Sequence, residues 1–247
     1  MYPYNNATIP TSALMIMTVT FFILIAIGEV IYAKKIIRTS SLKLLNVNIA
    51  NWLISIYQKG GYFLIGAITT VLIGDVCKLT IGRLRPHFID LCKPSIDCSL
   101  LINHNKYFNP DEFDCTANIT ADVLREARLS FPSGHASLTT YSAVFFILYL
   151  QLRITCKNLK LFKYLLQFIS ISITMFVSMT RIADYWHHWS DVTVGILIGL
   201  INALVTVFLV ADLFKEQKTR HVNNDQKIHD SINNNNDNGQ IKIHVPN

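Results

Sequence analysis

The sequence predicts an all-α integral membrane protein, a polytopic bundle of helices. Hydrophobic residues make up 51% of the chain and charged residues only 15%. The apolar residues form continuous runs of about 20, which is the length of a helix that crosses a bilayer. Lys and Arg gather in the short connections between these runs, so the net charge of +6 needs no nucleic-acid partner to explain it.

Five membrane spans are predicted from these runs. They cover approximately residues 12–33, 61–82, 134–152, 162–180 and 192–213. No basic residue precedes the first run, while Lys34, Lys35, Arg38 and Lys43 follow it directly. Because basic residues collect on the cytosolic side, the start of the chain should face outside. The stretch 44–60 is expected to lie at the membrane surface or to re-enter the membrane.

Residues 1–213 are therefore predicted to form one membrane-embedded domain. A polar loop at 83–133 is too long for a simple connector, and counting the spans places it outside. Residues 214–247 are rich in asparagine and have little to bury. We predict that they form a disordered cytosolic tail.

The outer loop also carries candidate sites of modification. Asn118 begins a glycosylation sequon in the loop, and Asn6 begins another near the start of the chain. Cys92, Cys98 and Cys115 all lie in the loop. Because the outer compartment is oxidising, one disulfide among these cysteines is expected, with all three pairings open.

A polar cluster lies between the fourth and fifth spans and contains Arg181, His187 and Asp191. His187 and Asp191 are four residues apart. If the last helix begins near Trp186, the carboxylate can accept a hydrogen bond from one ring nitrogen and leave the other free to attack. Taken alone, this stretch would be better explained as a basic and polar cap on a membrane helix, and the other clusters are needed to favour catalysis.

A second cluster lies where the second span leaves the membrane. Lys78 and Arg85 are seven residues apart, or about two helical turns, so both can point the same way. A fringe of lysine and arginine that reaches back to the membrane surface is the alternative. Such a fringe would lie on the outer side, where the topology rule predicts few cations.

A third cluster opens the third span with Ser133, Gly134 and His135. Ser133 suits a helix N-cap, and Gly134 lets a ligand approach the backbone closely. The free amides and the positive end of the helix dipole would then form an anion site. A plain helix start would explain the serine, but it would not explain His135 at the membrane rim.

Together these groups fit the transfer of a phosphoryl group. The three cations of the clusters can hold a phosphate dianion without a metal. His187 can attack phosphorus while Asp191 fixes its tautomer, and His135 can protonate the leaving alkoxide and then activate the water that hydrolyses the phosphohistidine. The sequence has no Asp, Glu and His cluster with spacing suited to a divalent metal, and no cofactor is expected.

In their order and separation, the clusters resemble the three signature motifs of the type 2 phosphatidic acid phosphatases. The motifs read Lys78-x6-Arg85-Pro86, Pro132-Ser133-Gly134-His135 and Arg181-x5-His187-x3-Asp191. The residues around them are most similar to the animal lipid phosphate phosphatases, over about residues 2–215. The resemblance implies magnesium-independent cleavage of phosphatidate, lysophosphatidate, sphingosine 1-phosphate, ceramide 1-phosphate and diacylglycerol pyrophosphate. It also implies that Ser133, Gly134 and His135 contact the phosphate as one unit.

Two features depart from that family. Thr180 stands where a serine usually opens the third motif, but it keeps a hydroxyl. The family has six spans, whereas the residues from Tyr2 to Pro10 resemble the outer loop that follows the first of them. The chain is therefore expected to lack that first helix, as an incomplete chain or a short isoform would. Every motif lies downstream of this region.

A lipid substrate is favoured because a lipid phosphate sits at headgroup depth, where the motifs leave the bilayer. The alternatives are a membrane phosphatase for a soluble phosphate ester and a catalytically silent surface protein that binds lipid phosphates. The intact set of His135, His187 and Asp191 favours catalysis. The expected location is the plasma membrane, or an internal membrane with a lumenal site, and the C-terminus should be cytosolic. Membrane phospholipids are the expected partners, and the sequence leaves open whether copies of the chain form a homo-oligomer.

Overall fold

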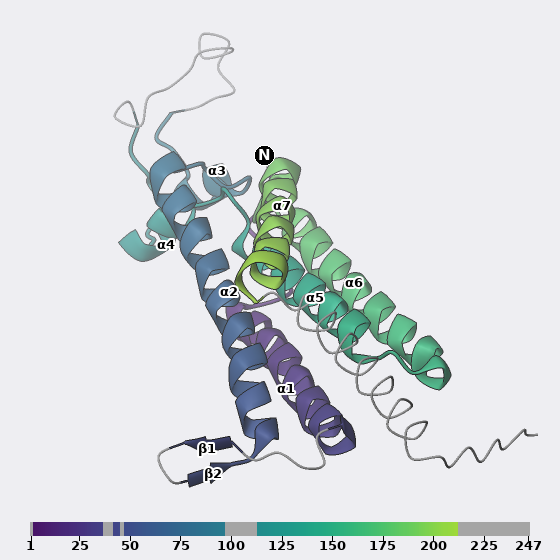
Figure 1. Cartoon of the computed structure of the whole chain (residues 1–247). Coiled ribbons are helices and arrows are strands. Elements are labelled where there is room, and N and C mark those ends of the chain that lie inside the picture. The colour runs from purple at the N-terminus through teal and green to yellow at the C-terminus, as the bar shows by residue number, and fades with distance from the viewer. Residues whose placement is uncertain (1, 37–41, 45–46, 97–112, 212–247) are drawn as a thin grey trace, which may run out of the picture.

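The computed structural model is a bundle of five long helices (Figure 1). It describes residues 2–36, 42–44, 47–96 and 113–211. The long helices are α1 (Thr11–Ile36), α2 (Asn51–Ile81), α5 (Gly134–Arg153), α6 (Lys160–Ala183) and α7 (Trp189–Val205). The shorter elements are the antiparallel pair β1 (Leu42–Leu44) and β2 (Val47–Ile49), α3 (Phe88–Cys92), α4 (Ala121–Glu126), a 3-10 turn at Lys157–Leu159 and a π turn at Thr206–Val210. The predicted all-α class is confirmed, while the predicted tail at 214–247 lies outside the described residues.

Four helices in the described part of the chain are long and apolar enough to cross a membrane. They are Thr11–Tyr32, Trp52–Ile81, Lys157–Ala183 and Trp189–Val210. Large apolar side chains such as Phe168 and Phe176 on α6 and Ile201 on α7 are exposed on the outside of the bundle. Such a surface is stable against lipid tails rather than water, and the chain is an integral membrane protein.

The remaining predicted span, 134–152, corresponds to α5, which is the central helix. It packs against α1, α2, α6 and α7. Its Ser137, Thr140 and Ser142 are buried. Because other helices surround α5, it does not need the apolar surface of a helix that faces lipid, and small hydroxyl residues suit close contacts between membrane helices. That α5 crosses the bilayer stays a prediction.

The second span differs most from its expected limits. Helix α2 begins at Asn51, so residues 51–60 are helical rather than a separate surface stretch. With 31 residues and a rise of about 1.5 Å each, α2 is about 46 Å long and exceeds the roughly 30 Å hydrocarbon core. At the other end, Gly82 takes a φ of 60° and its N–H binds the carbonyl of Lys78, which ends the helix.

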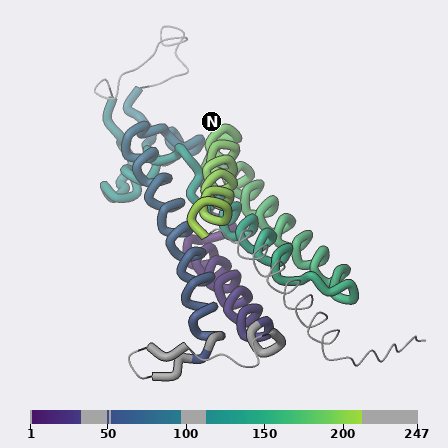
Figure 2. Tube along the Cα trace, in the orientation of Figure 1, coloured from purple at the N-terminus to yellow at the C-terminus, as the bar shows by residue number. Residues whose placement is uncertain are grey.

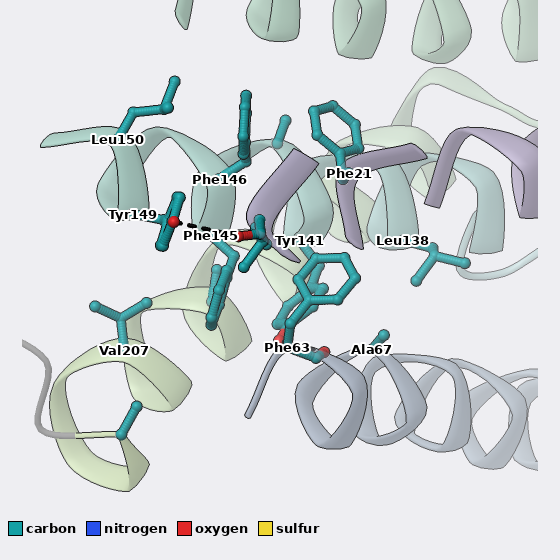
Figure 3. Packing of buried hydrophobic residues seen from close by; sticks show 14 of the residues in the cluster. Phe21, Phe63, Ala67, Leu138, Tyr141, Phe145, Phe146, Tyr149, Leu150 and Val207 are labelled. Carbon is teal, nitrogen blue, oxygen red and sulfur yellow. Dashed lines mark hydrogen bonds between the residues drawn. The ribbon is translucent and has the colours of Figure 1, made fainter. Parts of the chain in front are cut away.

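Aromatic side chains fill the centre of the bundle (Figure 3). Phe63 of α2 packs edge-on against Phe145 of α5, with ring centroids 5.3 Å apart, and Phe21 of α1 lies 5.3 Å from Phe146. The Tyr141 hydroxyl donates to the carbonyl of Phe63 at 2.9 Å. These contacts hold α1 and α2 against α5, and they fix the three helices whose ends frame the site.

Helices α5 and α7 approach each other closely at two glycines of α7. A Cβ added at Gly195 would lie 2.6 Å from the carbonyl oxygen of Ser133. A Cβ at Gly199 would collide with the carbonyl oxygen of Ser137. Glycines spaced four apart let membrane helices pack backbone to backbone. This close packing holds the start of α7 against the start of α5.

A buried ion pair joins α1 and α5 at the far end of α5. Glu29 is 0% exposed, and its two oxygens accept from Arg153 Nε at 2.7 Å and Nη2 at 2.9 Å. The Arg153 guanidinium also lies 4.2 Å from the centroid of the Tyr32 ring. Both partners are therefore matched, which is what a buried charge requires.

The two ends of the bundle differ in what they carry. The start of the chain, marked N in Figures 1 and 2, lies at the end that also carries α3 and α4. The pair of short strands lies at the opposite end (Figure 1). Helix α2 ends, and α5 and α7 begin, at the first of these ends, so the polar clusters of the sequence meet there.

Candidate active site

Six residues from the three sequence clusters line one cavity of about 250 Å³. They are Lys78, Arg85, Gly134, His135, Arg181 and His187. Lys78 lies in the last turn of α2, Gly134 and His135 begin α5, and Arg181 lies in the last turn of α6. Side chains of α1 and α2, including Leu14 and Val71, close the cavity on its apolar side.

Backbone hydrogen bonds explain why clusters far apart in the sequence meet. The loop after α2 pairs with the segment before α5, because Arg85 N–H binds the Ala127 carbonyl and Ser130 N–H binds the Arg83 carbonyl, each at 2.9 Å. The start of α5 is tied to α7, because Ser133 N–H binds the Asp191 carbonyl at 3.0 Å. These bonds are independent of the side chains that face the cavity.

The start of α5 has the geometry expected of an anion site. Ser133 is the N-cap, and its buried hydroxyl accepts from Ala136 N–H at 3.5 Å. Its side chain therefore caps the helix and does not line the cavity. A Cβ added at Gly134 would lie 3.2 Å from Lys78 Nζ, so the glycine leaves room for the lysine. Lys78 also pairs with Asp75 at 3.3 Å within α2.

The two arginines are buried, and each is held by an acidic residue. Arg85 Nη2 lies 2.9 Å from Glu126 Oε1, and its guanidinium stacks 4.5 Å from the centroid of the Trp186 ring. Arg181 is 1% exposed, and its Nη2 lies 3.2 Å from Asp184 Oδ2. The Nε atoms of both arginines are buried without a partner among the described residues. Each guanidinium thus keeps a donor for a ligand.

His187 is oriented by a backbone carbonyl, which differs from the prediction. Its Nδ1 lies 2.6 Å from the carbonyl oxygen of Ser130, whereas Asp191 Oδ2 is 4.0 Å away, beyond hydrogen-bond distance. The expected bond is missing because α7 begins at Trp189, so His187 precedes the helix and does not share its face with Asp191. A carbonyl can only accept, so Nδ1 carries the proton and Nε2 is free.

The turn that carries His187 is fixed at both sides. Tyr185 takes a φ of 58°, in the left-handed region, and His187 N–H binds the carbonyl of Arg181 at 3.1 Å. Burial, and then the positive charge of Arg85, lower the pKa of His187 well below its usual range. The ring is therefore neutral at physiological pH, as a nucleophile must be.

Asp191 does not line the cavity and is held behind His187. It is 0% exposed and forms an ion pair with Arg83. Its other oxygen accepts from the Ser130 hydroxyl at 2.6 Å and from His188 N–H at 3.0 Å. Ser130 therefore links Asp191 to His187, because its hydroxyl donates to the carboxylate and its carbonyl binds the ring.

His135 faces the cavity from the first turn of α5. Its Nε2 atom is buried and has no partner among the described residues. A hydrogen bond links the ring to the backbone of Ile9. His135 thus keeps a ring nitrogen that is available to exchange a proton with a bound group.

Sequence reasoning missed Ser130, Arg83 and Asp184 as parts of the site. Arg83 lies inside the first motif, and its charge on the side predicted to be outside was a usable signal. Ser130 lies two residues before the second motif, but the contact of its carbonyl with a histidine leaves no mark in the sequence. Asp184 follows Arg181 by three residues, the spacing of an ion pair on a helix. Within the described ranges, no group of three or more His, Cys, Asp or Glu side chains is placed to hold a metal ion.

In the described part of the loop at 83–133, a disulfide links Cys92 of α3 to Cys115. Of the three pairings left open by the sequence, the structure therefore has Cys92 with Cys115. Cys98 lies outside the described residues. Asn118 and Asn6, which begin the two sequons, are both exposed. Glycosylation at these asparagines stays a prediction.

Comparisons with known proteins agree with the motifs. The model of the PAP2 superfamily matches residues 59–215. The chain is 36% identical over 226 residues to phospholipid phosphatase 2 of Homo sapiens, covering 89% of this chain and 73% of that protein. It is 36% identical over 239 residues to phospholipid phosphatase 1 of Rattus norvegicus, covering 94% and 80%.

A Drosophila melanogaster protein named "Putative phosphatidate phosphatase" is 44% identical over 181 residues. That alignment covers 71% of this chain and 47% of the fly protein, so the chain spans about half the length of this relative. It spans about three quarters or more of the two mammalian relatives. No solved structure matches the chain.

Proposed function

This chain belongs to the PAP2 superfamily, and on that premise we propose that it is a hydrolase of lipid phosphates at the membrane surface. The proposed substrates are phosphatidate, lysophosphatidate, sphingosine 1-phosphate and ceramide 1-phosphate, in phospholipid metabolism and lipid signalling. One observation carries the proposal. Cations and histidines from three separate stretches of sequence line a single cavity.

The cations of the cavity bind the phosphate. A phosphate monoester is a dianion, and its charge lies on three equatorial oxygens during transfer. Lys78 and the free Nε donors of Arg85 and Arg181 offer positive charge around one point. The amides at the start of α5 add further donors, because the first N–H groups of a helix have no partner within it. Held in this way, the phosphate presents its phosphorus to His187.

The chemical step is a displacement by His187 Nε2. A bond forms between Nε2 and phosphorus while the bond from phosphorus to the lipid oxygen breaks. His135 enters this step protonated. The lipid oxygen leaves with the electron pair and takes the proton from His135 Nε2, so the products are a neutral alcohol and a neutral His135 ring. The Ser130 carbonyl holds the Nδ1 proton of His187 throughout, so it stabilises the positive charge that develops on the ring.

The second step regenerates the enzyme. His135, now without its extra proton, accepts one from water as the water attacks phosphorus. The bond from nitrogen to phosphorus breaks, inorganic phosphate leaves, and both histidines return to their starting states. No step in this scheme requires a group outside the chain and its substrate except water.

A test of this function uses protein purified in detergent and given phosphatidate with excess EDTA. We expect phosphate release from the wild type and a loss of about 10³-fold or more in His187→Ala. A trapped phosphohistidine in brief reactions with labelled substrate would support the covalent step. Absence of release by the wild type would favour a silent lipid-phosphate binder, and release from glucose 6-phosphate but not phosphatidate would favour a phosphatase for soluble esters.

We also propose that the cavity faces the extracellular or lumenal side, with the C-terminus in the cytosol. The charge bias of the sequence supports this orientation. The disulfide of the outer loop supports it too, because disulfides persist in oxidising compartments. A glycan on Asn118, removable by an endoglycosidase and absent in Asn118→Gln, is the expected result. The orientation would be contradicted if Asn118 carried no glycan and a labelling reagent reached the loop only after the membrane was permeabilised.

A further inference from the structure

The N-terminal segment, defined as residues 2–10, lies against the turn that carries the proposed nucleophile. Trp186 Nε1 donates to the carbonyl of Asn5 at 2.9 Å, and the Tyr2 and Tyr185 rings are 4.7 Å apart between centroids. Tyr4 N–H donates to Asp90 Oδ2 at 2.8 Å. Ile9, near the end of the segment, is buried. The segment thus packs against the residues that surround the site, although none of its own residues lines the cavity.

Within this segment, Thr8 contacts the carboxylate that pairs with Arg181. Its N–H donates to Asp184 Oδ2 and its hydroxyl to Asp184 Oδ1, each at 2.8 Å. Asp184 Oδ2 in turn lies 3.2 Å from Arg181 Nη2. Both oxygens of one carboxylate are therefore fixed by a single residue that lies 176 positions away in the chain.

This arrangement decides how Arg181 is presented. A carboxylate free to rotate can grip a guanidinium through two parallel hydrogen bonds and use up its donors. Asp184 instead reaches one Nη atom, and Arg181 Nε stays buried without a partner in the described part of the chain. Thr8 holds the carboxylate in the orientation that leaves this donor available.

The neighbouring residue acts on the second group in the cavity. The backbone of Ile9 forms a hydrogen bond with the ring of His135. Of two successive residues, Thr8 therefore contacts the carboxylate that pairs with Arg181, and Ile9 contacts His135 itself. Neither residue itself lines the cavity.

We propose that Thr8 is a positioning residue of the phosphate site, acting through Asp184 on Arg181. The inference rests on the proposed function, because it assigns Arg181 to the substrate phosphate. Loss of the Thr8 hydroxyl frees one oxygen of Asp184, which turns toward Arg181 and competes with the phosphate. The effect falls on phosphate binding, so it raises KM and the inhibition constant of inorganic phosphate more than it lowers kcat.

The same threonine completes the sequon of Asn6, so the experiment must separate the glycan from the hydrogen bond. The background is Asn6→Gln, which removes the sequon and keeps the Thr8 contacts. On this background Thr8→Val removes the hydroxyl, while Thr8→Ser retains it. Thr20→Val is a matched control, because the Thr20 hydroxyl on α1 binds only a carbonyl of its own helix among the described contacts.

The readouts are kcat and KM for phosphatidate, inhibition by inorganic phosphate, and the rise in thermal unfolding temperature that inorganic phosphate produces. For Thr8→Val we expect KM and the inhibition constant to rise about 5- to 20-fold, as loss of one hydrogen bond to a charged group predicts. Thr8→Ser and Thr20→Val should stay within about twofold of the background. The proposal would be overturned if Thr8→Val had the KM and inhibition constant of the background. It would also be overturned if these constants rose as much in Thr8→Ser as in Thr8→Val.

A double-mutant cycle distinguishes positioning from a general loss of stability. Asp184→Asn keeps the shape of the side chain and removes its charge. If Thr8 acts through Asp184, the effects of Thr8→Val and Asp184→Asn on phosphate affinity should be clearly non-additive, and additive effects would refute the route. If Thr8→Val does not fold, Asp184→Asn and Thr8→Ala are compared by the same phosphate-dependent stabilisation. Stabilisation by inorganic phosphate can be measured without turnover. An inactive wild type would therefore count against the proposed function, while the effect of Thr8 on phosphate binding would still be measured.

Discussion

Two buried clusters of charge lie at opposite ends of α5, and they are built differently. At one end Glu29 and Arg153 are matched, with two hydrogen bonds between a carboxylate and a guanidinium. At the other end the cavity gathers Lys78, Arg85 and Arg181, and donors of both arginines lack partners among the described residues. The two ends of this helix are about 28 Å apart.

The difference teaches how burial and function are related in this bundle. A buried charge with a complete partner avoids the cost of an unpaired charge and has nothing left to offer a ligand. A buried donor without a partner costs stability, and such groups concentrate where a ligand completes them. The Arg153 side chain is 14% exposed and that of Arg181 is 2% exposed, yet only Arg181 keeps a buried donor without a partner among the described residues. Each prediction below tests that contrast.

The largest effect is expected from breaking the matched pair. Glu29→Ala leaves Arg153 buried without its carboxylate, which should cost about 3–5 kcal/mol of stability. Thermal unfolding in detergent measures this loss. The activity of the protein that stays folded should remain within about twofold of wild type, because the pair is far from the cavity.

A double substitution, Glu29→Leu with Arg153→Met, supplies the control. It removes both charges, and most of the lost stability should return. If the double variant is as unstable as Glu29→Ala, the pair is not the source of the effect. If Glu29→Ala instead abolishes turnover without lowering the unfolding temperature, the contrast between the two ends is wrong.

The next effect tests the unmatched end. Arg181→Lys keeps the positive charge but loses the planar set of donors that can contact both a carboxylate and a phosphate. We expect kcat/KM for phosphatidate to fall about 10²-fold, with little change in unfolding temperature. Arg125→Lys, at an exposed arginine of α4, is the matched control and should be silent. Equal losses in the two variants would show that the guanidinium of Arg181 has no special role.

A smaller effect is expected at Ser130, which links Asp191 to His187. Ser130→Ala removes the hydroxyl that donates to Asp191 but keeps the carbonyl that accepts from His187. The carbonyl should then be less well fixed, and kcat should fall about 10-fold with KM little changed. Ser178→Ala is a suitable control, because the Ser178 hydroxyl is also buried but lacks a partner in the described part of the chain. A normal kcat in Ser130→Ala would show that Asp191 does not act through this residue.

The sequence alone was sufficient for most of the bundle, because apolar runs are a direct consequence of contact with lipid. It failed at the start of α2, where Gln58 and Lys59 interrupt the apolar pattern although the helix continues. Helix α5 is harder to recognise as a span for a different reason. Its surface contacts neighbouring helices rather than lipid, so it can carry polar side chains. Helix packing is a property of the whole bundle and cannot be read from one segment.

For the site, the sequence identified the side chains but not all of their contacts. Residues with charge or an imidazole stand out in the three clusters, and five of them line the cavity. The partner of His187 could not be predicted, because every residue has a carbonyl and the start of α7 decides which one is near. The contact between Thr8 and Asp184 joins distant residues of ordinary type, so only the folded chain reveals it.

The smallest predicted effect concerns pH and the burial of His187. Burial and the charge of Arg85 hold the pKa of His187 well below its usual range, so the folded protein keeps the ring neutral while the unfolded chain takes up a proton near pH 6.5. The unfolded state therefore binds more protons, and this contribution to stability falls as the pH drops below about 6.5. Between pH 7.5 and 5.5 the loss should be at most about 1.4 kcal/mol. Comparing the unfolding temperatures of wild type and His187→Gln at both pH values isolates it, since the other histidines are common to both proteins. If the wild type loses no more stability than His187→Gln between these pH values, the buried ring accepts a proton in the folded protein. The description of this end of the bundle as a neutral nucleophile facing three cations would then be wrong.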